Sequence, residues 1–320
     1  MKKNLLILTA LAGILLAGCQ SVEDLLPEMV SEERMTPEGK YFLTMEASKE
    51  IPGQARNDGG TKALSLDGNT LNAYWKDGEQ VSVFKNGDAL RKGILTVDAD
   101  ESDRTKALLS GPLHDTMGLT ENNILILVYP RFNWDYTGQN GAAPSETGDL
   151  ATKFDYATAS ATVQSVNKEE KTITVKNAAV FQHQQSMYRF GFKVGGTGDA
   201  IAIKGFTVSS THNTLVRSRS WNKSDWTDNY GSICVNAAST LTTLYVSLRN
   251  TLVSSSYPAD DETIRDTYSF DVIGYDNALY LGEKKIPGKV MTAQGKFISA
   301  QNISITKSNL AQSGTATEVW

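Results

Sequence analysis

The chain has 320 residues, of which 40% are hydrophobic and 21% charged, and its formal net charge is −5. This length favours two domains of ordinary size, each able to bury an apolar core. The acidic balance, together with the lack of a basic patch, of zinc-type cysteine spacing and of an aromatic-plus-arginine stripe, argues against a nucleic-acid partner.

The first residues form a secretion signal. Lys2 and Lys3 precede an apolar run from Leu5 to Leu16, which is shorter than the roughly 20 apolar residues that a membrane-spanning helix needs. Residues 16–19, Leu-Ala-Gly-Cys, closely resemble the bacterial lipoprotein box. That resemblance implies cleavage between Gly18 and Cys19, a lipid (palmitate-type) modification of Cys19 and attachment to the outer membrane. The alternative is an ordinary signal peptide with a cysteine at its boundary.

Residues 1–18 are therefore the predicted lipoprotein signal peptide, and residues 19–39 an acidic tether. The tether contains six acidic residues against one basic residue, Arg34, and Pro27 and Pro37 interrupt any long helix. This composition is typical of a solvated, flexible stalk. A single amphipathic turn near the membrane is the alternative.

A β-strand pattern begins at Tyr41, where aromatic and branched residues alternate with polar ones as far as Ala47. Residues 51–60 follow with a proline, three glycines and an Asn-Asp pair, which predict an exposed loop with Arg56 in its middle.

Short strands separated by turns of the Asp-Gly and Asn-Gly type continue the chain. They are expected at 62–66, 71–75, 81–84, 93–97, 106–109, 123–129, 161–166 and 171–175. This spacing favours an all-β sandwich or barrel over residues 40–182, the N-terminal domain. The long connection from Pro130 to Asp149 is predicted to be a surface loop.

The alternation pauses around residues 177–185, and the domain boundary is placed there, so that the C-terminal β-domain covers residues 183–320. Its strands are expected at 187–194, 200–209, 215–216, 232–235, 240–248, 268–275, 279–286 and 297–305. No segment of ten or more residues shows a convincing helical period.

The sequence predicts a protein that is not an enzyme and has no cofactor and no metal. His114, His183 and His212 are isolated from one another and from any nucleophile motif. The acidic stretch 98–103 lacks the central glycine of an EF-hand loop and is predicted to be a solvated loop. With Cys19 assigned to lipid, no intramolecular disulfide is expected, and Cys234 is predicted to be a buried thiol.

Trp221, Trp226 and Tyr230 are interleaved with polar residues, a composition that can stack on sugar rings. They are candidate glycan contacts, and the alternative is that they cover a sheet edge or fill the core.

Taken together, these features resemble the fimbrillin-like family, the lipoprotein pilins and related surface subunits of Bacteroidales-type anaerobes. The likeness is a pattern spread over most of the chain without a chemical signature. Its clearest stretches are the lipoprotein box, the strand 41–47, the segment 61–84, and the residues 154–157, 180–183 and 188–190.

The resemblance implies two transthyretin-like β-sandwich domains. It also implies a mode of assembly. A trypsin-like protease cuts after an arginine behind the first strand, that strand leaves, and a strand of a neighbouring fimbrial subunit fills the groove by strand addition. The candidate cut lies between Arg56 and Asn57, with Arg34 as the second choice, and no regulated cleavage as the alternative.

Residues 310–320 are the candidate donor strand, but they alternate apolar and polar residues only weakly, so a tip or accessory subunit fits as well. The predicted function is a structural or adhesive subunit of cell-surface fimbriae that binds other subunits and host or bacterial surface glycans or proteins. The alternative is a surface glycan-binding lipoprotein that does not polymerise.

Overall fold

The computed structural model describes residues 40–50, 64–67, 70–114, 118–130, 134–145, 149–223, 225–251, 262–291 and 294–308. Several predicted positions lie outside these residues and stay predictions: Gly18, Cys19, Arg34, Arg56, Asn57 and the segment 310–320.

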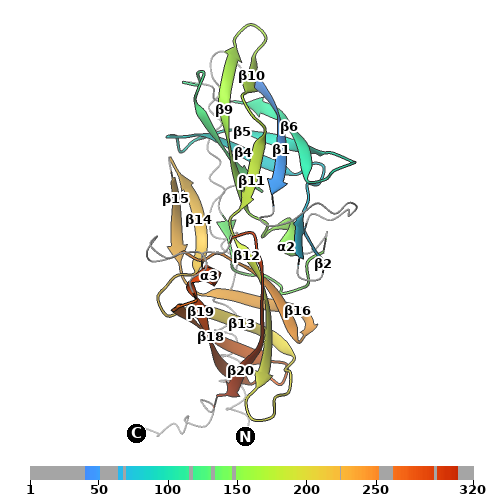
Figure 1. Cartoon of the computed structure of the whole chain (residues 1–320), viewed down its shortest axis with the longest axis vertical. Coiled ribbons are helices and arrows are strands. Elements are labelled where there is room, and N and C mark those ends of the chain that lie inside the picture. Colours follow the sequence, from blue (N-terminus) through green and yellow to red (C-terminus); the bar gives the residue numbers. More distant parts are fainter. Residues whose placement is uncertain are drawn as a thin grey trace, which may run out of the picture.

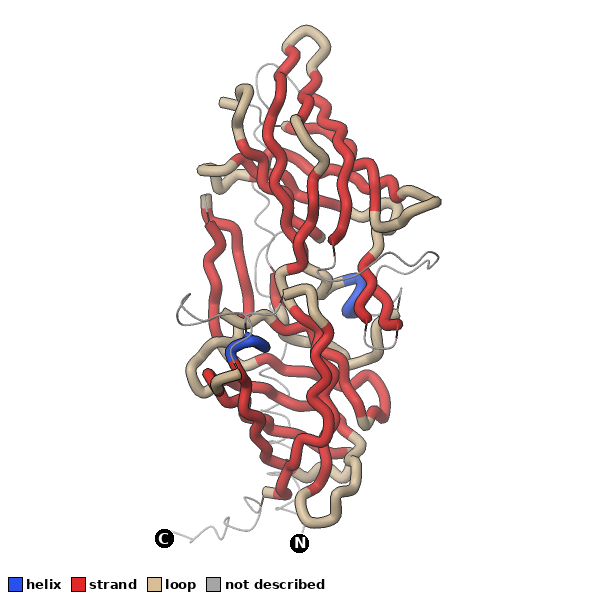
Figure 2. Tube along the Cα trace, in the orientation of Figure 1, coloured by secondary structure: helices blue, strands red, loops and turns tan. Residues whose placement is uncertain are grey.

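The described chain is built almost entirely from strands, as Figure 2 shows. Its two helices, α2 (Asp149–Thr152) and α3 (Gly288–Met291), have four residues each. No helix within the described residues is long and apolar enough to cross a membrane. The predicted all-β fold class is therefore confirmed, with the strands of each half layered around an apolar core.

The first half of the chain forms a sheet that closes on itself, drawn in blue to green in Figure 1. Its hydrogen-bonded order is β10-β1-β11-β9-β7-β4-β5-β6, and β1 also pairs with β6, the last strand of that order. The strands are β1 (Tyr41–Glu50), β4 (Gln80–Lys85), β5 (Arg91–Ala99), β6 (Lys106–Leu113), β7 (Ile124–Tyr129), β9 (Ala157–Asn167), β10 (Thr172–Val175) and β11 (Ala179–His183).

The second half forms a seven-stranded sheet in the order β16-β13-β18-β19-β20-β12-β17. Its strands are β12 (Ser186–Val194), β13 (Ile203–Ser210), β16 (Ile233–Leu241), β17 (Thr243–Leu248), β18 (Ile264–Gly274), β19 (Leu279–Pro287) and β20 (Phe297–Lys307). The chain thus passes from one sheet to the other between β11 and β12. The predicted division at residues 182 and 183 remains a proposal.

Two smaller sheets complete the described structure. One joins β2 (Leu64–Asp67) to β3 (Thr70–Ala73), and the other has the order β15-β14-β8. β14 (Val216–Asn222) and β15 (Asp225–Tyr230) form a hairpin of the second half, whereas β8 (Trp134–Asp135) comes from the first half. This antiparallel sheet, which has strands from both halves, lies between them in Figure 1.

The pause in alternation expected around residues 177–185 is not found, because β11 occupies residues 179–183. Ala179, Phe181 and His183 face inward, and Val180 and Gln182 face outward. The polar residues around this strand conceal its period of two. β11 belongs to the first sheet, where it pairs with both β1 and β9.

The prediction of a surface loop from Pro130 to Asp149 is wrong for residues 134–141, whereas Ala143 and Ser145 are exposed. Trp134 and Tyr136 are 1% and 0% exposed, and Gln139 is fully buried. Both aromatic rings belong to the apolar core of the second half. A long connection with turn residues can pack as a core element when a neighbouring sheet supplies its hydrogen bonds, and that is the case here.

The segment around Gln139 lies between β16 and β17, the two end strands of the second sheet. Its backbone bonds to both strands, through Asn236 N–H to the Gln139 carbonyl (2.9 Å) and Tyr245 N–H to the Gly141 carbonyl (2.9 Å). The Gln139 side chain donates to the Ser247 carbonyl (2.8 Å) and accepts from the Ser247 N–H (2.7 Å). A residue of the first half therefore satisfies edge groups of the second sheet.

Replacing Gln139 tests whether its hydrogen bonds to the edge of the second sheet stabilise the fold. Gln139→Ala removes both bonds to Ser247 and leaves buried backbone groups unpaired, so the free energy of unfolding is expected to fall by about 2–3 kcal/mol. Urea unfolding followed by tryptophan fluorescence measures this change. Gln182→Ala, at an exposed position of β11, is the matched control, and equal midpoints for the two variants would contradict the assigned role of Gln139.

Candidate functional site

The candidate functional site is the place in the first sheet that β1 occupies. It pairs antiparallel with β6 from Tyr41↔Leu113 to Ser48↔Lys106, and on its other side it pairs in parallel with β10 and β11. It is the strand that closes the first sheet, as the blue arrow between β6 and β11 in Figure 1 shows. β1 thus supplies the partner for one edge of β6 and for the facing edges of β10 and β11.

One face of β1 fills the apolar core of the first half. Tyr41, Leu43, Met45 and Ala47 are all less than 5% exposed, whereas the intervening residues point outward and Phe42 is 50% exposed. Burying each large apolar side chain contributes about 1.5–3 kcal/mol. β1 is therefore held in place both by backbone hydrogen bonds along its edges and by the burial of every second side chain.

The fifth inward position of β1 holds a charged residue, Lys49, whose side chain is 0% exposed. Its Nζ donates to Asp155 Oδ2 (3.0 Å) and to the Tyr74 carbonyl (3.1 Å). The same ammonium lies 4.5 Å from the ring centroid of Trp75 and 4.0 Å from that of Tyr129. We call these four partners, Tyr74, Trp75, Tyr129 and Asp155, the ammonium socket.

Asp155 is the counterion in the ammonium socket and is itself buried, with a 1% exposed side chain. His183 of β11 approaches it from another side, with Nδ1 3.0 Å from Asp155 Oδ1. Burial by itself raises the pKa of Asp155, but Lys49 and then His183 outweigh burial and lower the pKa to about 2. Asp155 is therefore ionised at neutral pH.

A second carboxyl group, Glu79, is close by but is satisfied differently. It accepts a hydrogen bond from the Tyr129 hydroxyl (2.6 Å) and another from the Lys76 N–H (3.1 Å). Burial raises the pKa of Glu79 more than its neighbours lower it. Glu79 therefore holds Tyr129 in place, while Asp155 balances the lysine.

The junction between the two halves lies next to the ammonium socket. Gln184, directly after β11, accepts a bond at its side chain from Arg219 (3.0 Å) and at its carbonyl from Arg249 (2.6 Å). The Arg219 guanidinium also lies 4.8 Å from the Trp226 ring and donates to Asp228 (2.5 Å). These contacts fix the passage from one sheet to the other.

Two of the predicted glycan contacts lie in this junction. Trp226 stacks on Trp134 with ring centroids 4.3 Å apart, and the Trp221 Nε1 donates to the Asp88 carbonyl (3.0 Å). Both tryptophans are half-buried, whereas Tyr230 is 42% exposed. The structure brings Trp221 and Trp226 together, 5.6 Å apart, at the contact between the halves. Sugar binding by these residues stays a prediction.

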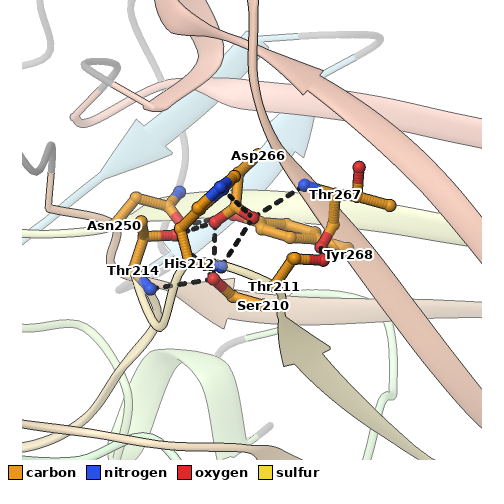
Figure 3. Close-up of polar contacts among 8 residues, drawn as sticks. All are labelled: Ser210, Thr211, His212, Thr214, Asn250, Asp266, Thr267 and Tyr268. Carbon is orange, nitrogen blue, oxygen red and sulfur yellow. Dashed lines mark hydrogen bonds and ion pairs between the residues drawn. The ribbon is translucent and has the colours of Figure 1, made fainter.

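The second half contains a separate polar cluster around Asp266, drawn in Figure 3. The Asp266 carboxylate accepts hydrogen bonds from the hydroxyls of Ser210 and Thr214 and from the backbone N–H of His212 and Thr267. Burial raises the pKa of Asp266, but these donors lower it below its ordinary value. The cluster fixes the turn after β13.

The Asp266 cluster contains the residue types of a serine hydrolase in an arrangement that does not suit hydrolysis. In a catalytic triad the histidine lies between the serine and the aspartate. Here the aspartate lies between them, since Ser210 and His212 both contact Asp266 (Figure 3). The serine proton is therefore directed at a carboxylate that already accepts other donors, and the group is a structural hub.

The described residues contain no group of three or more His, Cys, Asp and Glu side chains that could hold a metal ion. Cys234 is 8% exposed on β16, which agrees with its predicted burial. The expectation that the chain has no disulfide depends on Cys19, which lies outside the described residues, and stays a prediction.

Lys49 and Asp155 are not among the site residues predicted from the sequence. A signal for the lysine was present, because Lys49 continues the inward positions 41, 43, 45 and 47 of the first strand. A charged residue in that phase indicates a buried partner. Nothing in the sequence identifies Asp155 as that partner, since 106 residues separate the two.

Comparison with known proteins gives matches among solved structures. No protein-family model and no curated protein matches the sequence. A candidate cell adhesion protein from Bacteroides uniformis is 11% identical and has a TM-score of 0.41, with 86% of this chain and 98% of that chain covered.

Two further matches are a shaft pilin of Lactobacillus rhamnosus and a fimbrial protein of Bacteroides ovatus. The pilin is 12% identical (TM-score 0.31; 85% of this chain, 99% of that chain), and the fimbrial protein 11% (0.29; 83% and 50%). All three TM-scores lie below 0.5.

The ion pair predicts an acid-sensitive first half. The folded-state pKa of Asp155, about 2, lies below its ordinary value of 3.8, so ionised Asp155 stabilises the fold above about pH 4 and this contribution disappears as the pH falls toward 2. The loss is about 2 kcal/mol. Urea unfolding at pH 5, 4, 3 and 2.5 measures this loss. In Asp155→Asn, the fall in the free energy of unfolding over this pH range should be smaller by about 2 kcal/mol. An unchanged slope would contradict the assignment.

Removing the lysine alone tests the balance of charge. Lys49→Met leaves Asp155 without its main counterion and should lower the free energy of unfolding by about 3–5 kcal/mol. The double variant Lys49→Met/Asp155→Leu should recover part of this loss, because no carboxylate is left unpaired. Glu46→Gln, on the exposed face of the same strand, serves as the control and should change stability by less than about 0.5 kcal/mol. Additive effects in the double variant would rule out the coupling.

Proposed function

We propose that this protein is a structural or adhesive subunit of cell-surface fimbriae. It is exported as an outer-membrane lipoprotein through Cys19 and assembled by strand exchange after its first strand is removed. The observation that carries the proposal is the place of β1, which closes the first sheet and fills its core with alternate side chains. The proposed role is non-enzymatic.

The position of β1 in the chain suits removal. It is the first described strand, and the candidate cut after Arg56 falls between β1 and β2, so cleavage there interrupts no described strand. Departure of β1 leaves unpaired the backbone N–H and C=O groups along the facing edges of β6, β10 and β11. It also uncovers the apolar groove that β1 filled. A strand from a neighbouring subunit can restore both, because strand addition uses backbone hydrogen bonds for affinity and alternate side chains for specificity.

The cut is tested on fibres sheared from the producing cells. Mass spectrometry should find an N-terminus at Asn57 in the assembled protein, and Arg56→Gln should leave lipid-modified Cys19 as the N-terminus and abolish SDS-resistant ladders. Arg34→Gln is the matched control and should assemble normally. Assembled fibres that start at Cys19 would overturn the proposal. Mass spectrometry after digestion under non-reducing conditions also tests Cys19. A peptide with lipid on Cys19 is expected, and a disulfide between Cys19 and Cys234 would contradict the lipid attachment.

A glycan-binding lipoprotein that does not polymerise is the second candidate. Tyr230 is the most exposed of its three predicted contacts. Binding on a glycan array that is lost in Tyr230→Ala and in the Trp221 and Trp226 variants, together with the absence of ladders, would favour this candidate over the first.

A further inference from the structure

The ammonium socket remains with the protein when β1 leaves. Tyr74, Trp75, Tyr129 and Asp155 all follow the candidate cut in the chain, whereas Lys49 precedes it. Cleavage would therefore separate a buried carboxylate from its cation. His183 would stay against Asp155, with its Nδ1 3.0 Å from Asp155 Oδ1.

The chemistry of the ammonium socket restricts what can replace β1. A neutral side chain at the Lys49 position would bury the Asp155 carboxylate without its main counterion, and an acidic one would add repulsion. The two aromatic faces favour a cation as well, because ring quadrupoles attract positive charge. The carboxylate, the carbonyl and the two rings together suit a compact ammonium group held at the end of a long side chain.

The candidate donor segment of this chain lacks such a group. Residues 310–320 contain no lysine or arginine, and they include Glu318. Lys307, the last basic residue before them, is the final residue of β20, where it pairs with Tyr280 of β19. Copies of this chain therefore do not offer one another a suitable strand from this segment.

We propose that the groove accepts a strand from a different polypeptide, in which alternating apolar residues are followed at the socket end by a lysine. This inference rests on the proposed strand exchange and names the chemistry of its partner. Apolar side chains replace Tyr41, Leu43, Met45 and Ala47, and the lysine replaces Lys49 against Asp155. The ammonium socket thus selects among possible donor strands by charge.

The test uses labelled peptides and the chain from residue 20 onward, with a specific protease site in place of residues 54–58. After cleavage, peptides with the sequence of residues 41–50 exchange into the groove in moderate urea, and fluorescence anisotropy measures their affinity. The wild-type peptide should bind, and a Glu46→Gln peptide should bind equally well. A Lys49→Met peptide should bind about a hundredfold more weakly, and a peptide of residues 310–320 should not compete.

A change in the acceptor completes the test. In Asp155→Asn protein, shown by circular dichroism to be folded, the preference for the Lys49 peptide over the Lys49→Met peptide should fall below about tenfold, because the charge that selects lysine is gone. Equal binding of both peptides to the unmodified groove would overturn this inference and leave strand exchange intact. Failure of the wild-type peptide to bind would reject strand exchange, and this inference with it.

Discussion

The buried contact between Lys49 and Asp155 is the interaction on which the architecture of the first half depends. It attaches the last inward position of β1 to the connection before β9, beside the passage from the first sheet to the second. A buried ion pair adds little net stability, because desolvation offsets attraction, but the loss of one partner is strongly destabilising. The pair therefore restricts which side chain position 49 can hold more than it adds to the stability of the fold.

The second half is closed by a different device. The segment around Gln139 enters between β16 and β17 and satisfies both edges with its backbone and its side chain amide. Each large sheet is thus completed by a segment that is distant in the chain from the strands it pairs with. The difference lies in attachment, since the Gln139 segment is continuous with the chain on both sides, whereas β1 is attached to the other described strands on one side only.

The junction explains how a first strand could leave without separating the halves. Arg219 and Arg249 hold Gln184, Trp226 stacks on Trp134, and Trp221 donates to Asp88. None of these groups belongs to β1, so they would remain in place after cleavage. Two of the aromatic residues that the sequence offers as glycan contacts, Trp221 and Trp226, lie at the contact between the two sheets.

The sequence by itself determined the all-β class and most strand positions, because a period of two and turn residues such as Asp-Gly are local signals. It also determined the alternating face of β1, from Tyr41 to Ala47. It did not reveal β11 or the burial of Trp134 and Tyr136, where polar and turn residues concealed core positions. Only the tertiary structure decided that Lys49 meets Asp155 and that Gln139 closes the second sheet, because pairing across about a hundred residues depends on how the strands are ordered in space and leaves no periodic trace in the chain.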